Sequence, residues 1–224
     1  LHPRVRRQRQ MCIRDRWEIT YKVFANGIIK VDNRFVAEGT ETPMIPRVGL
    51  RMQLSEILND LTYYGRGPEE NYRDRRTSQF IGEYTTPIKD LYEPYIRPQE
   101  NEHHTDIYWC ALTTKQKAGL LFIADRTFEL NASNYLLGSL DSGETIDNGA
   151  PRTNETNHRH LTDPQPVKQV DMFIDYRMMG VGGDNSWGAI AHEPYLIRPG
   201  VENTIEYGFS IVPFDKKADY KNLI

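Results

Sequence analysis

The sequence predicts an all-β fold, a large antiparallel β-sandwich that occupies residues 17–224. Three observations lead to this prediction. Short runs rich in β-branched and aromatic residues recur between Gly, Pro, Asn and Asp residues, as strands do between turns. Several runs alternate apolar and polar residues, the pattern of a strand with one buried face. Helical periodicity is scarce, and an α/β barrel would need about 250 residues with a helix after each strand.

The predicted strands begin at Trp17. The runs 17–24 and 28–38 flank Asn26-Gly27, a dipeptide typical of a type I′ hairpin turn. Further strands are predicted at 48–54, 61–67, 106–114, 118–125, 167–180, 193–200 and 203–214. In two of these runs the apolar residues share one face: Val170, Met172, Ile174 and Tyr176 in the first, and Ile205, Tyr207, Phe209 and Ile211 in the second.

The segments between the strands are less regular. Residues 55–61 and 131–141 could each form a short helix or a turn, and Ser55 is a plausible N-cap. The stretches 65–105 and 139–166 are expected to be long loops. Connections of that length are uncommon in compact domains, which indicates that they are functional or packed on a neighbour.

Residues 1–16 differ from the rest of the chain. They contain six Arg and one Asp, whereas the remaining residues carry 22 basic and 30 acidic side chains. A basic arm for nucleic acid or targeting is one interpretation. A secretory signal is excluded, because the segment has no apolar core of about 7–15 residues. Its core, QRQMCIRD, resembles a translated sequencing adapter, which favours a non-native, disordered extension.

Several partner classes are disfavoured by composition. The acidic body lacks the clustered Lys and Arg that phosphate binding needs, so no nucleic acid is expected. No apolar run approaches the roughly 20 residues of a membrane helix, so no membrane partner is expected. Cys12 lies in the basic segment, and the apolar neighbours of Cys110 favour a buried structural thiol. The compartment stays open, with the cytoplasm favoured over the periplasm.

Two polar loops could carry chemistry. The loop 65–75, GRGPEENYRDR, has glycines, but the spacing is wrong for a phosphate cradle and Pro68 removes a backbone donor. A tight turn with Arg–carboxylate pairing is the favoured interpretation. The loop 92–101, YEPYIRPQEN, mixes two Tyr with carboxylate, amide and guanidinium groups. Such a mixture suits a sugar, whose hydroxyls need polar partners and whose C–H faces stack on rings, and it equally suits a satisfied polar loop.

A third loop, MGVGGDNSW at 179–187, ends in Trp187. Its three glycines permit left-handed backbone and close approach. Trp187 at such a tip could stack on a pyranose or fold back onto its own sheet, and the spacing leaves both interpretations open. Asp184 and Asn185 are further candidate substrate ligands. They form no convincing metal site, because no other acidic ligand lies at the spacing of a calcium loop.

The histidines and carboxylates nominate no catalytic group. His158 and His160 could point the same way, but a zinc site lacks a third ligand, and buried hydrogen-bonding histidines are favoured. A retaining glycosidase needs two carboxylates about 5 Å apart. No spacing in this chain identifies such a pair.

The loop sequences resemble the C-terminal domain of the glycoside hydrolase family 2 β-galactosidases of the long-chain bacterial type. The matching stretches, in the family's order, are GRGPEENYRDR (65–75), DLYEPYIRPQEN (90–101), TNHRHL (156–161) and GVGGDNSW (180–187). The likeness covers about 17–214. It implies a large antiparallel sandwich similar to the galactose mutarotases. It also implies that Trp187 reaches into the active site and stacks on the sugar, with Asn101 as a weaker candidate ligand.

The same resemblance implies what the chain does not supply. In the family, the two catalytic glutamates and the magnesium and sodium ligands belong to an upstream barrel domain. The first strands of the sandwich should precede Trp17, so the domain is expected to be truncated at its N-terminus. One loop departs from the pattern: after Asn101 the family usually has Gly and, two residues later, Arg, whereas Glu102 and His104 stand here.

Three functions are therefore considered. The first is a fragment of a β-galactosidase that hydrolyses terminal β-D-galactosides such as lactose with retention, in which this domain forms one wall of the sugar site. Its expected partners are the barrel domain of the same enzyme and further subunits of a homo-oligomer. The second is an independent carbohydrate-binding module. The third is a mutarotase-like enzyme, for which His158, His160 and His192 are the candidate bases.

Overall fold

The structure, a computed structural model, describes residues 16–37, 43–141, 160–185, 188–202 and 204–224. Nine antiparallel strands account for about half of this part of the chain. Their bounds are β1 (Arg16–Val23), β2 (Ile29–Val36), β3 (Arg47–Ser55), β4 (Asp60–Gly67), β5 (Phe80–Pro87), β6 (His104–Thr113), β7 (Gly119–Ser133), β8 (Gln169–Met178) and β9 (Thr204–Phe214). The predicted all-β antiparallel sandwich is confirmed.

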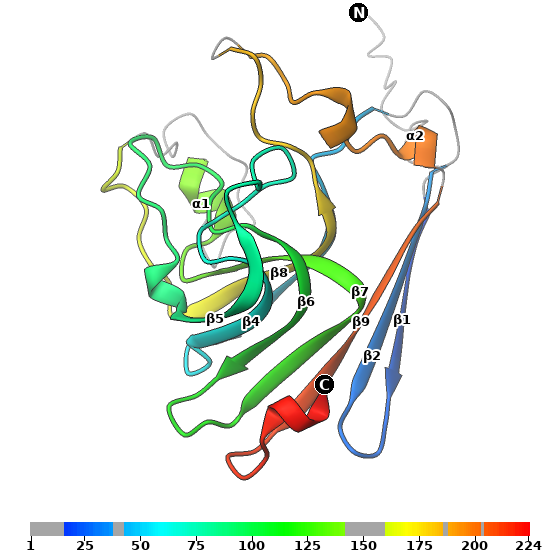
Figure 1. Cartoon of the computed structure of the whole chain (residues 1–224), viewed down its shortest axis with the longest axis vertical. Helices are drawn as coiled ribbons and strands as arrows, with labels where there is room; N and C mark the ends of the chain where they lie inside the picture. Colours follow the sequence, from blue (N-terminus) through cyan, green and yellow to red (C-terminus); the bar gives the residue numbers. More distant parts are fainter. Residues whose placement is uncertain (1–15, 38–42, 142–159, 186–187, 203) are drawn as a thin grey trace, which may run out of the picture.

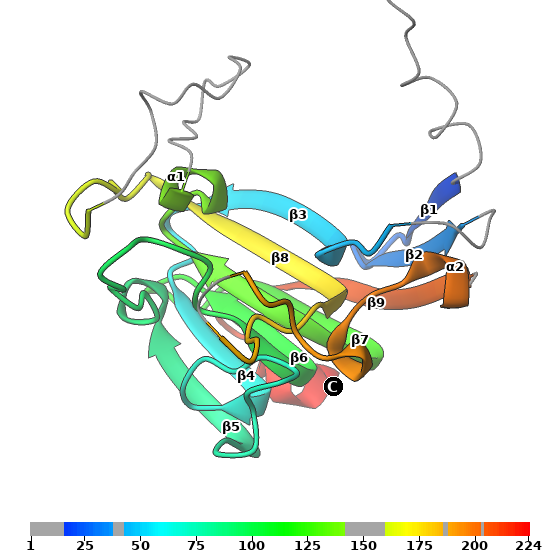
Figure 2. The same ribbon diagram turned by 90° about the horizontal axis from the view of Figure 1, so that it is seen from above.

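The strands form two layers that share β7 (Figure 1). One path runs β1-β2-β9-β7-β6-β4-β5, and a second pairs β3 with β8 and β8 with β7. Residues 119–124 of β7 pair with β9, whereas residues 129–133 pair with β8. The long strand therefore crosses from one layer to the other. Figure 2 shows β3 and β8 lying across one face of β4, β6 and β7.

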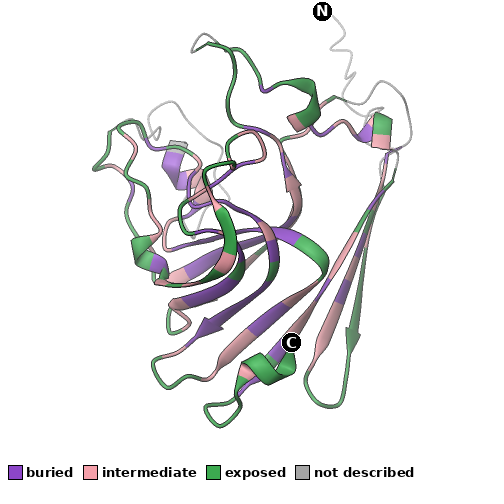
Figure 3. Cartoon of the chain, viewed as in Figure 1, coloured by how far each residue is buried: buried purple, intermediate pink, exposed green. Residues whose placement is uncertain are grey.

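The core lies between these layers. It is built from inward-facing residues of β2, β4, β6, β7, β8 and β9, and Figure 3 shows the buried positions concentrated there. Strand β8 is buried on both faces: Met172 and Ile174 contact the apolar core, while Asp171 and Asp175 on the other face are buried too. Cys110 is buried in the same core, as predicted, and burial raises the pKa of its thiol.

Most predicted strands are confirmed within a few residues, and three predictions were wrong. Residues 193–200 form two short helical turns, η5 (Glu193–Tyr195) and α2 (Pro199–Glu202), because Pro194 and Pro199 disfavour a strand ladder. Residues 80–87, assigned to a loop, form β5, an edge strand that pairs with β4 through its backbone. Strand β7 continues to Ser133, past the predicted end, because β8 supplies a second partner. Among the other short elements, η3 spans Ile88–Asp90, α1 spans Leu137–Asp141 and η6 spans Tyr220–Leu223.

The first hairpin also differs in detail. Gly27 N–H donates to Phe24 O at 2.9 Å, and Gly27 has φ 86° while Asn26 does not have positive φ. A type I′ turn requires positive φ at both central residues. The predicted turn type was therefore wrong, although the hairpin itself is confirmed. Strand β1 begins at Arg16, one residue inside the predicted extension, and residues 1–15 lie outside the described part of the chain. Within that part, no helix has the length and apolar character needed to cross a membrane.

Candidate functional site

The loop 65–75 is held by Arg–carboxylate pairs, as predicted. Arg66 Nε lies 2.7 Å from Asp106 Oδ2, and Arg75 Nη2 lies 2.6 Å from Glu70 Oε1. Asn71 is fully buried, and its amide oxygen accepts from Thr105 N–H at 3.0 Å and from Thr105 Oγ1 at 2.6 Å. The contacts of Arg66 and Asn71 fasten the loop to the start of β6.

The second loop is packed on the first through Glu70. The Tyr95 hydroxyl donates to Glu70 Oε1, and the backbone N–H of Glu102 donates to Glu70 Oε2 at 3.0 Å. Asn101, a predicted substrate ligand, is buried; its Nδ2 donates to Gln99 O at 2.8 Å and its Oδ1 accepts from Glu93 N–H. The Asn101 side chain thus fixes the shape of its own loop, and a role toward a substrate stays a prediction.

The glycine-rich third loop is tied to the first by one carboxylate. Asp74 accepts hydrogen bonds from the backbone N–H groups of Val181 at 3.2 Å and Gly182 at 2.7 Å. A Cβ on Gly180 would lie 2.7 Å from Asp74 Cγ and 2.8 Å from Ala191 Cβ. Glycine is therefore needed at residue 180 for the close approach. The structure brings together the three loops that the sequence singled out separately.

The predicted ligands of the third loop are placed only in part. Trp187 lies outside the described residues, so its stacking role stays a prediction. Asp184 is exposed, and its Oδ1 lies 2.8 Å from Nε2 of His192, which is exposed as well. Asn185 is exposed in the same loop. Both Asp184 and Asn185 are accessible from solvent beside the position of Trp187 in the chain.

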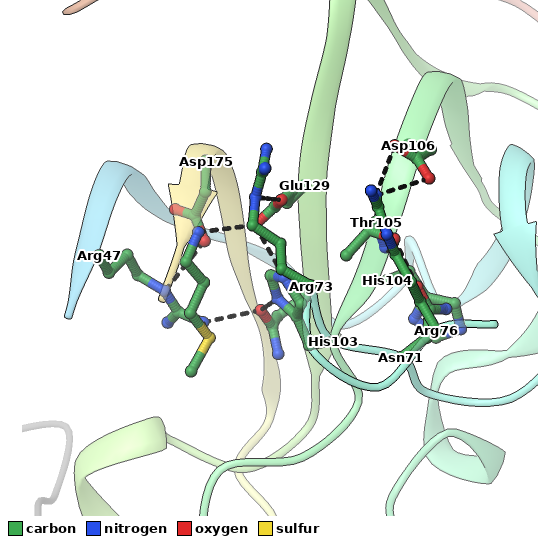
Figure 4. Close-up of polar contacts among 12 residues, drawn as sticks. Arg47, Asn71, Arg73, Arg76, His103, His104, Thr105, Asp106, Glu129 and Asp175 are labelled. Carbon is green, nitrogen blue, oxygen red and sulfur yellow. Dashed lines mark hydrogen bonds and ion pairs between the residues drawn. The ribbon is translucent and has the colours of Figure 1, made fainter. Parts of the chain in front are cut away.

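Beneath the loops lies a buried polar network centred on His103 (Figure 4). His103 Nε2 lies 3.1 Å from Glu129 Oε2, and His103 Nδ1 lies 2.7 Å from Asn131 Oδ1. The Asn131 amide is oriented by Nδ2, which donates to Asn101 O at 2.8 Å. Both ring nitrogens of His103 therefore face acceptors, an arrangement that favours the imidazolium. Burial would lower the pKa of His103, but the hydrogen bond and charge of Glu129 outweigh burial and raise it.

Two arginines complete this network. Arg73 Nε donates to Glu129 Oε1 at 2.7 Å, and Met178 N–H donates to Glu129 Oε2 at 2.6 Å. Arg47 Nε lies 2.9 Å from Oδ2 of the fully buried Asp175. Burial raises the pKa of Asp175 to about 7 against the attraction of Arg47. No sequence pattern predicted this network, because its members come from distant segments; the paired His103-His104 is the one local feature that could have drawn notice.

The residues that depart from the family pattern are both buried. Glu102 has φ 65°, the left-handed region that favours glycine, and this explains why a Gly would fit there. Glu102 Oε1 accepts from Ser133 Oγ at 3.1 Å, and burial raises the pKa of the Glu102 carboxyl well above its usual value. His104 lies 3.2 Å from Pro68 O and 3.0 Å from Glu102 O through its two ring nitrogens. Burial lowers the pKa of His104 and outweighs the hydrogen bonds of the Glu102 and Pro68 carbonyls, which raise it.

A cleft of about 1110 Å³ lies where β9 separates from β7. It is polar, and its lining includes Arg73, Asn33, Arg126 and Tyr207. Asn33 is buried, and neither polar atom of its side chain has a partner among the described residues. Arg73 belongs both to the cleft and to the Glu129 network, so the cleft borders the network that supports the three loops.

Of the two histidines at 158 and 160 that were predicted to be buried and hydrogen-bonded, the structure describes His160. His160 is exposed and lies 3.3 Å from Asp163 in a short turn, so the prediction that it is a buried histidine was wrong. His158 lies outside the described residues. Among the residues that the structure describes, no three His, Cys, Asp or Glu side chains are grouped so that they could hold a metal ion.

Comparison with known proteins gives one consistent result. The family model of the beta galactosidase small chain matches residues 3–211. The chain is 32% identical over 179 residues to a beta-galactosidase of Priestia megaterium, which covers 80% of this chain and 16% of that protein. It is 30% identical over 190 residues to a beta-galactosidase of Vibrio cholerae, covering 85% and 16%, respectively. The chain thus spans about a sixth of the length of the curated relatives that it matches.

Proposed function

The chain belongs to the β-galactosidase small-chain family, and from this premise we propose that it forms one wall of the galactoside site of a β-galactosidase. In this proposal the complete enzyme cleaves terminal β-D-galactosides such as lactose. The wall consists of the three loops at 65–75, 90–101 and 180–187. Trp187 supplies a ring that stacks on the sugar, and Asp184 and Asn185 supply polar groups beside it.

The observation that supports this proposal most strongly is the pair of hydrogen bonds from Val181 and Gly182 to Asp74. A stacking ring contributes to binding only if its loop is held in place before the sugar arrives. Asp74 fixes the backbone five residues before Trp187. The loop that carries Asp74 is itself fixed by Asn71 and by Glu70, which contacts the second loop.

The buried network supplies the rigid support for this wall. Glu129 accepts hydrogen bonds from Arg73 and from the backbone of Met178, so it joins the first loop to the strand that leads into the third. His103 adds its charge to the same carboxylate. Residues that act in this way position the loops and do not touch the sugar. Removing one partner of such a buried charge pair destabilises the fold strongly, because the other charge stays buried without compensation.

The chemistry itself is proposed to lie elsewhere in the enzyme. Hydrolysis with retention requires a pair of carboxylates about 5–5.5 Å apart, one of which forms a glycosyl-enzyme. We assign no catalytic role to Glu129, Glu102 or Asp175, since all three are buried inside the domain. The two catalytic glutamates and the magnesium and sodium ions are assigned to the barrel domain expected from the family resemblance.

The mutarotase-like alternative needs a histidine and a carboxylate that face one sugar. His103 and Glu129 form such a pair, but both are buried beneath the loops. His192 and Asp184 form an exposed pair at the third loop, and this observation keeps the alternative open to a direct test. An isolated chain that accelerates the interconversion of galactose anomers, and loses this activity in His192→Ala, would favour the alternative.

The test of the proposal is Asp74→Ala in the complete β-galactosidase that carries this chain. The matched control is Asp215→Ala, because Asp215 also accepts two backbone hydrogen bonds, from Lys217 and Ala218, but in a turn after the end of β9. Asp74→Ala should lower kcat/KM for a chromogenic galactoside by roughly tenfold or more, since charge-assisted hydrogen bonds contribute about 1.5–3 kcal/mol each. Asp215→Ala should leave kcat/KM unchanged. Equal kinetics for the two variants, with equal melting temperatures, would refute the role assigned to the third loop.

A further inference from the structure

Asp106 is one of three non-glycine residues with left-handed backbone in the described part of the chain. Its φ is 57°, and the other two, Glu102 and Lys117, both have φ 65°. Lys117 lies in the exposed hairpin loop between β6 and β7, where a left-handed residue is common. Asp106 lies within β6, where left-handed backbone lowers the stability of every residue except glycine. Strain of this kind persists where the surrounding contacts impose it, and it is typical of functional sites.

The strained residue lies in a β-bulge. From His104 to Ile107, β6 advances three residues, whereas β7 advances two, from Leu130 to Phe128. One residue of β6 is therefore extra, and the left-handed residue of such a bulge is usually glycine. A bulge also changes the direction in which a side chain leaves its strand. In this bulge the side chain is the carboxylate of Asp106.

The Asp106 carboxylate joins the two ends of the loop between β4 and β5. Arg66 lies on β4, and its Nε donates to Asp106 Oδ2 at 2.7 Å. Arg76 lies four residues before β5, and its Nη1 lies 3.0 Å from Asp106 Oδ1 and 2.9 Å from Oδ2 (Figure 4). Arg66 also donates through Nη1 to Gln79 O at 2.9 Å. Asp106 therefore closes the base of the β4–β5 loop.

Asp74, which holds the third loop, lies inside this closed loop. It belongs to a tight turn that is fastened by two backbone hydrogen bonds, of 2.8 and 3.1 Å. On one side of Asp74, Arg73 anchors the turn to Glu129. On the other side, Arg76 anchors it to Asp106. The position of Asp74 thus depends on one anchor before it and one after it.

We propose that Asp106 is a positioning residue, and that its strained backbone serves this role although it lowers stability. Asp106 fixes the β4–β5 loop so that Asp74 meets the backbone N–H groups of Val181 and Gly182. Asp106 itself touches no substrate. Its consequence for catalysis rests on the proposed function, whereas the link from Asp106 to the third loop is measurable without any substrate.

Stability alone does not account for an aspartate at this position. The side chains of Asp106, Arg66 and Arg76 are 29%, 23% and 33% exposed, so solvent screens both ion pairs in part. Glycine would relieve the left-handed backbone, and both arginines lie close enough to the surface to turn into solvent. A chain with glycine at this position should therefore be about as stable as the wild type. What the aspartate adds is the fixed position of the loop.

Three variants of the full chain separate loop position from stability. Asp106→Gly relieves the backbone and removes both arginine contacts. Asp106→Asn keeps the side-chain length and one oxygen that accepts a hydrogen bond, and asparagine tolerates left-handed backbone. Lys117→Gly is the matched control, because it relieves backbone of the same hand in the hairpin loop between β6 and β7 and leaves the β4–β5 loop unaltered.

The first measurement is hydrogen–deuterium exchange of peptides that contain Val181 and Gly182. In Asp106→Gly their exchange should be about fivefold or more faster than in the wild type, and should approach that of Asp74→Ala, because the acceptor is no longer held in place. Asp106→Asn should lie between Asp106→Gly and the wild type, and Lys117→Gly should match the wild type. Exchange in β9 should be unchanged, and every melting temperature should stay within about 4 °C of the wild type.

The second measurement is the kinetics of the complete β-galactosidase with a chromogenic galactoside. Asp106→Gly should raise KM about fivefold or more, and Asp106→Asn should raise it less, because a loop that is ordered only on binding weakens the binding of substrate. Lys117→Gly should leave KM unchanged. A mere loss of folded enzyme would instead lower kcat at constant KM.

The outcomes separate the positioning role from the proposed function. Unchanged exchange of Val181 and Gly182 in Asp106→Gly overturns the positioning role, whatever the kinetics. Faster exchange in β9 with a larger fall in melting temperature, or a fall in kcat at constant KM, makes Asp106 a residue of the fold alone and overturns it as well. Faster exchange confined to the third loop, with unchanged kinetics, supports the positioning role and refutes the function proposed for that loop.

Discussion

Glu102 lowers the stability of the fold in two ways, and two substitutions can measure the two effects separately. Its backbone is left-handed at φ 65°, and its carboxyl group is buried. Glu102→Gln keeps the side-chain volume and the backbone strain but removes the ionisable group. Glu102→Gly removes the side chain and relieves the strain. Comparison of both variants with the wild type therefore isolates the carboxyl group first and the backbone second.

The carboxyl group makes a pH-dependent contribution whose sign is fixed. Burial raises the pKa of Glu102 in the folded chain above the value of about 4.3 that it has when unfolded. Its contribution to stability is therefore fully present below the unfolded pKa and is lost as the pH rises through the folded pKa. Glu102→Gln has no such loss. The stability of Glu102→Gln relative to the wild type should increase as the pH rises above the unfolded pKa of about 4.3, by roughly 1.4 kcal/mol for each unit by which the folded pKa is raised.

The backbone adds a term that does not depend on pH. A non-glycine residue in the left-handed region costs about 1–2 kcal/mol. Glycine relieves this cost but loses about 0.5–1 kcal/mol through the greater freedom of the unfolded chain, and a cavity is left beside Ser133. Because Ser133 Oγ also accepts from Tyr135 N–H at 2.8 Å, its hydroxyl keeps a partner. Glu102→Gly should thus lie within about 1 kcal/mol of Glu102→Gln, with a parallel pH profile.

The assay is urea unfolding of all three chains at several pH values, followed by fluorescence or circular dichroism. Other groups with shifted pKa values, such as Asp175 and His103, are present in every chain and cancel in the differences. If wild type and Glu102→Gln keep a constant difference across the pH range, the Glu102 carboxyl group ionises without cost and the burial argument is wrong. A large destabilisation by Glu102→Gly alone would show that the side chain is needed for packing.

Three further predictions concern the chain and its enzyme. The purified chain should not hydrolyse a chromogenic β-galactoside, because the catalytic glutamates are assigned to another domain; sustained turnover that is lost on mutating one of its own carboxylates would contradict this. In the complete enzyme, Trp187→Ala should lower kcat/KM roughly 5- to 150-fold through loss of about 1–3 kcal/mol of stacking, with little change in melting temperature. Unchanged kinetics with a large fall in melting temperature would make Trp187 a core residue. Removal of residues 1–15 by limited proteolysis should leave thermal stability unchanged, whereas a fall of several degrees would show that the segment packs on the domain.

The strands could be predicted where their residues carry a local signal. The runs that became β3, β4, β6, β8 and β9 alternate or are rich in β-branched and aromatic residues, and the structure confirms them. Strand β5 was missed because its face is largely exposed and Gly82 interrupts it; its stability comes from the ladder with β4. The segment 193–200 was wrongly predicted to be a strand. Its apolar residues Leu196 and Ile197 are buried as strand residues are, although the backbone turns there.

The candidate site was predictable only as separate loops. Glycine, tyrosine and arginine composition marked the three loops, but nothing in the sequence showed that Asp74 holds the third loop or that Glu70 holds the second. The buried network is less visible still. His103, Glu129 and Arg47 lie far apart in the chain and meet because β6, β7, β8 and β3 are successive neighbours in the sheet.

The sequence by itself determined the all-β class, the order of most strands, the buried thiol of Cys110 and the family, because alternation, turn residues and ordered motifs are local properties of the chain. The tertiary structure decided which loops meet and which carboxylates are buried. Those features depend on strand pairing over long sequence separations, and the energy of a buried charge depends on partners that only the folded chain brings within hydrogen-bond distance. Residue 102 needed both the sequence and the structure. The family pattern usually has Gly where Glu102 stands, and the structure shows that the backbone is left-handed there.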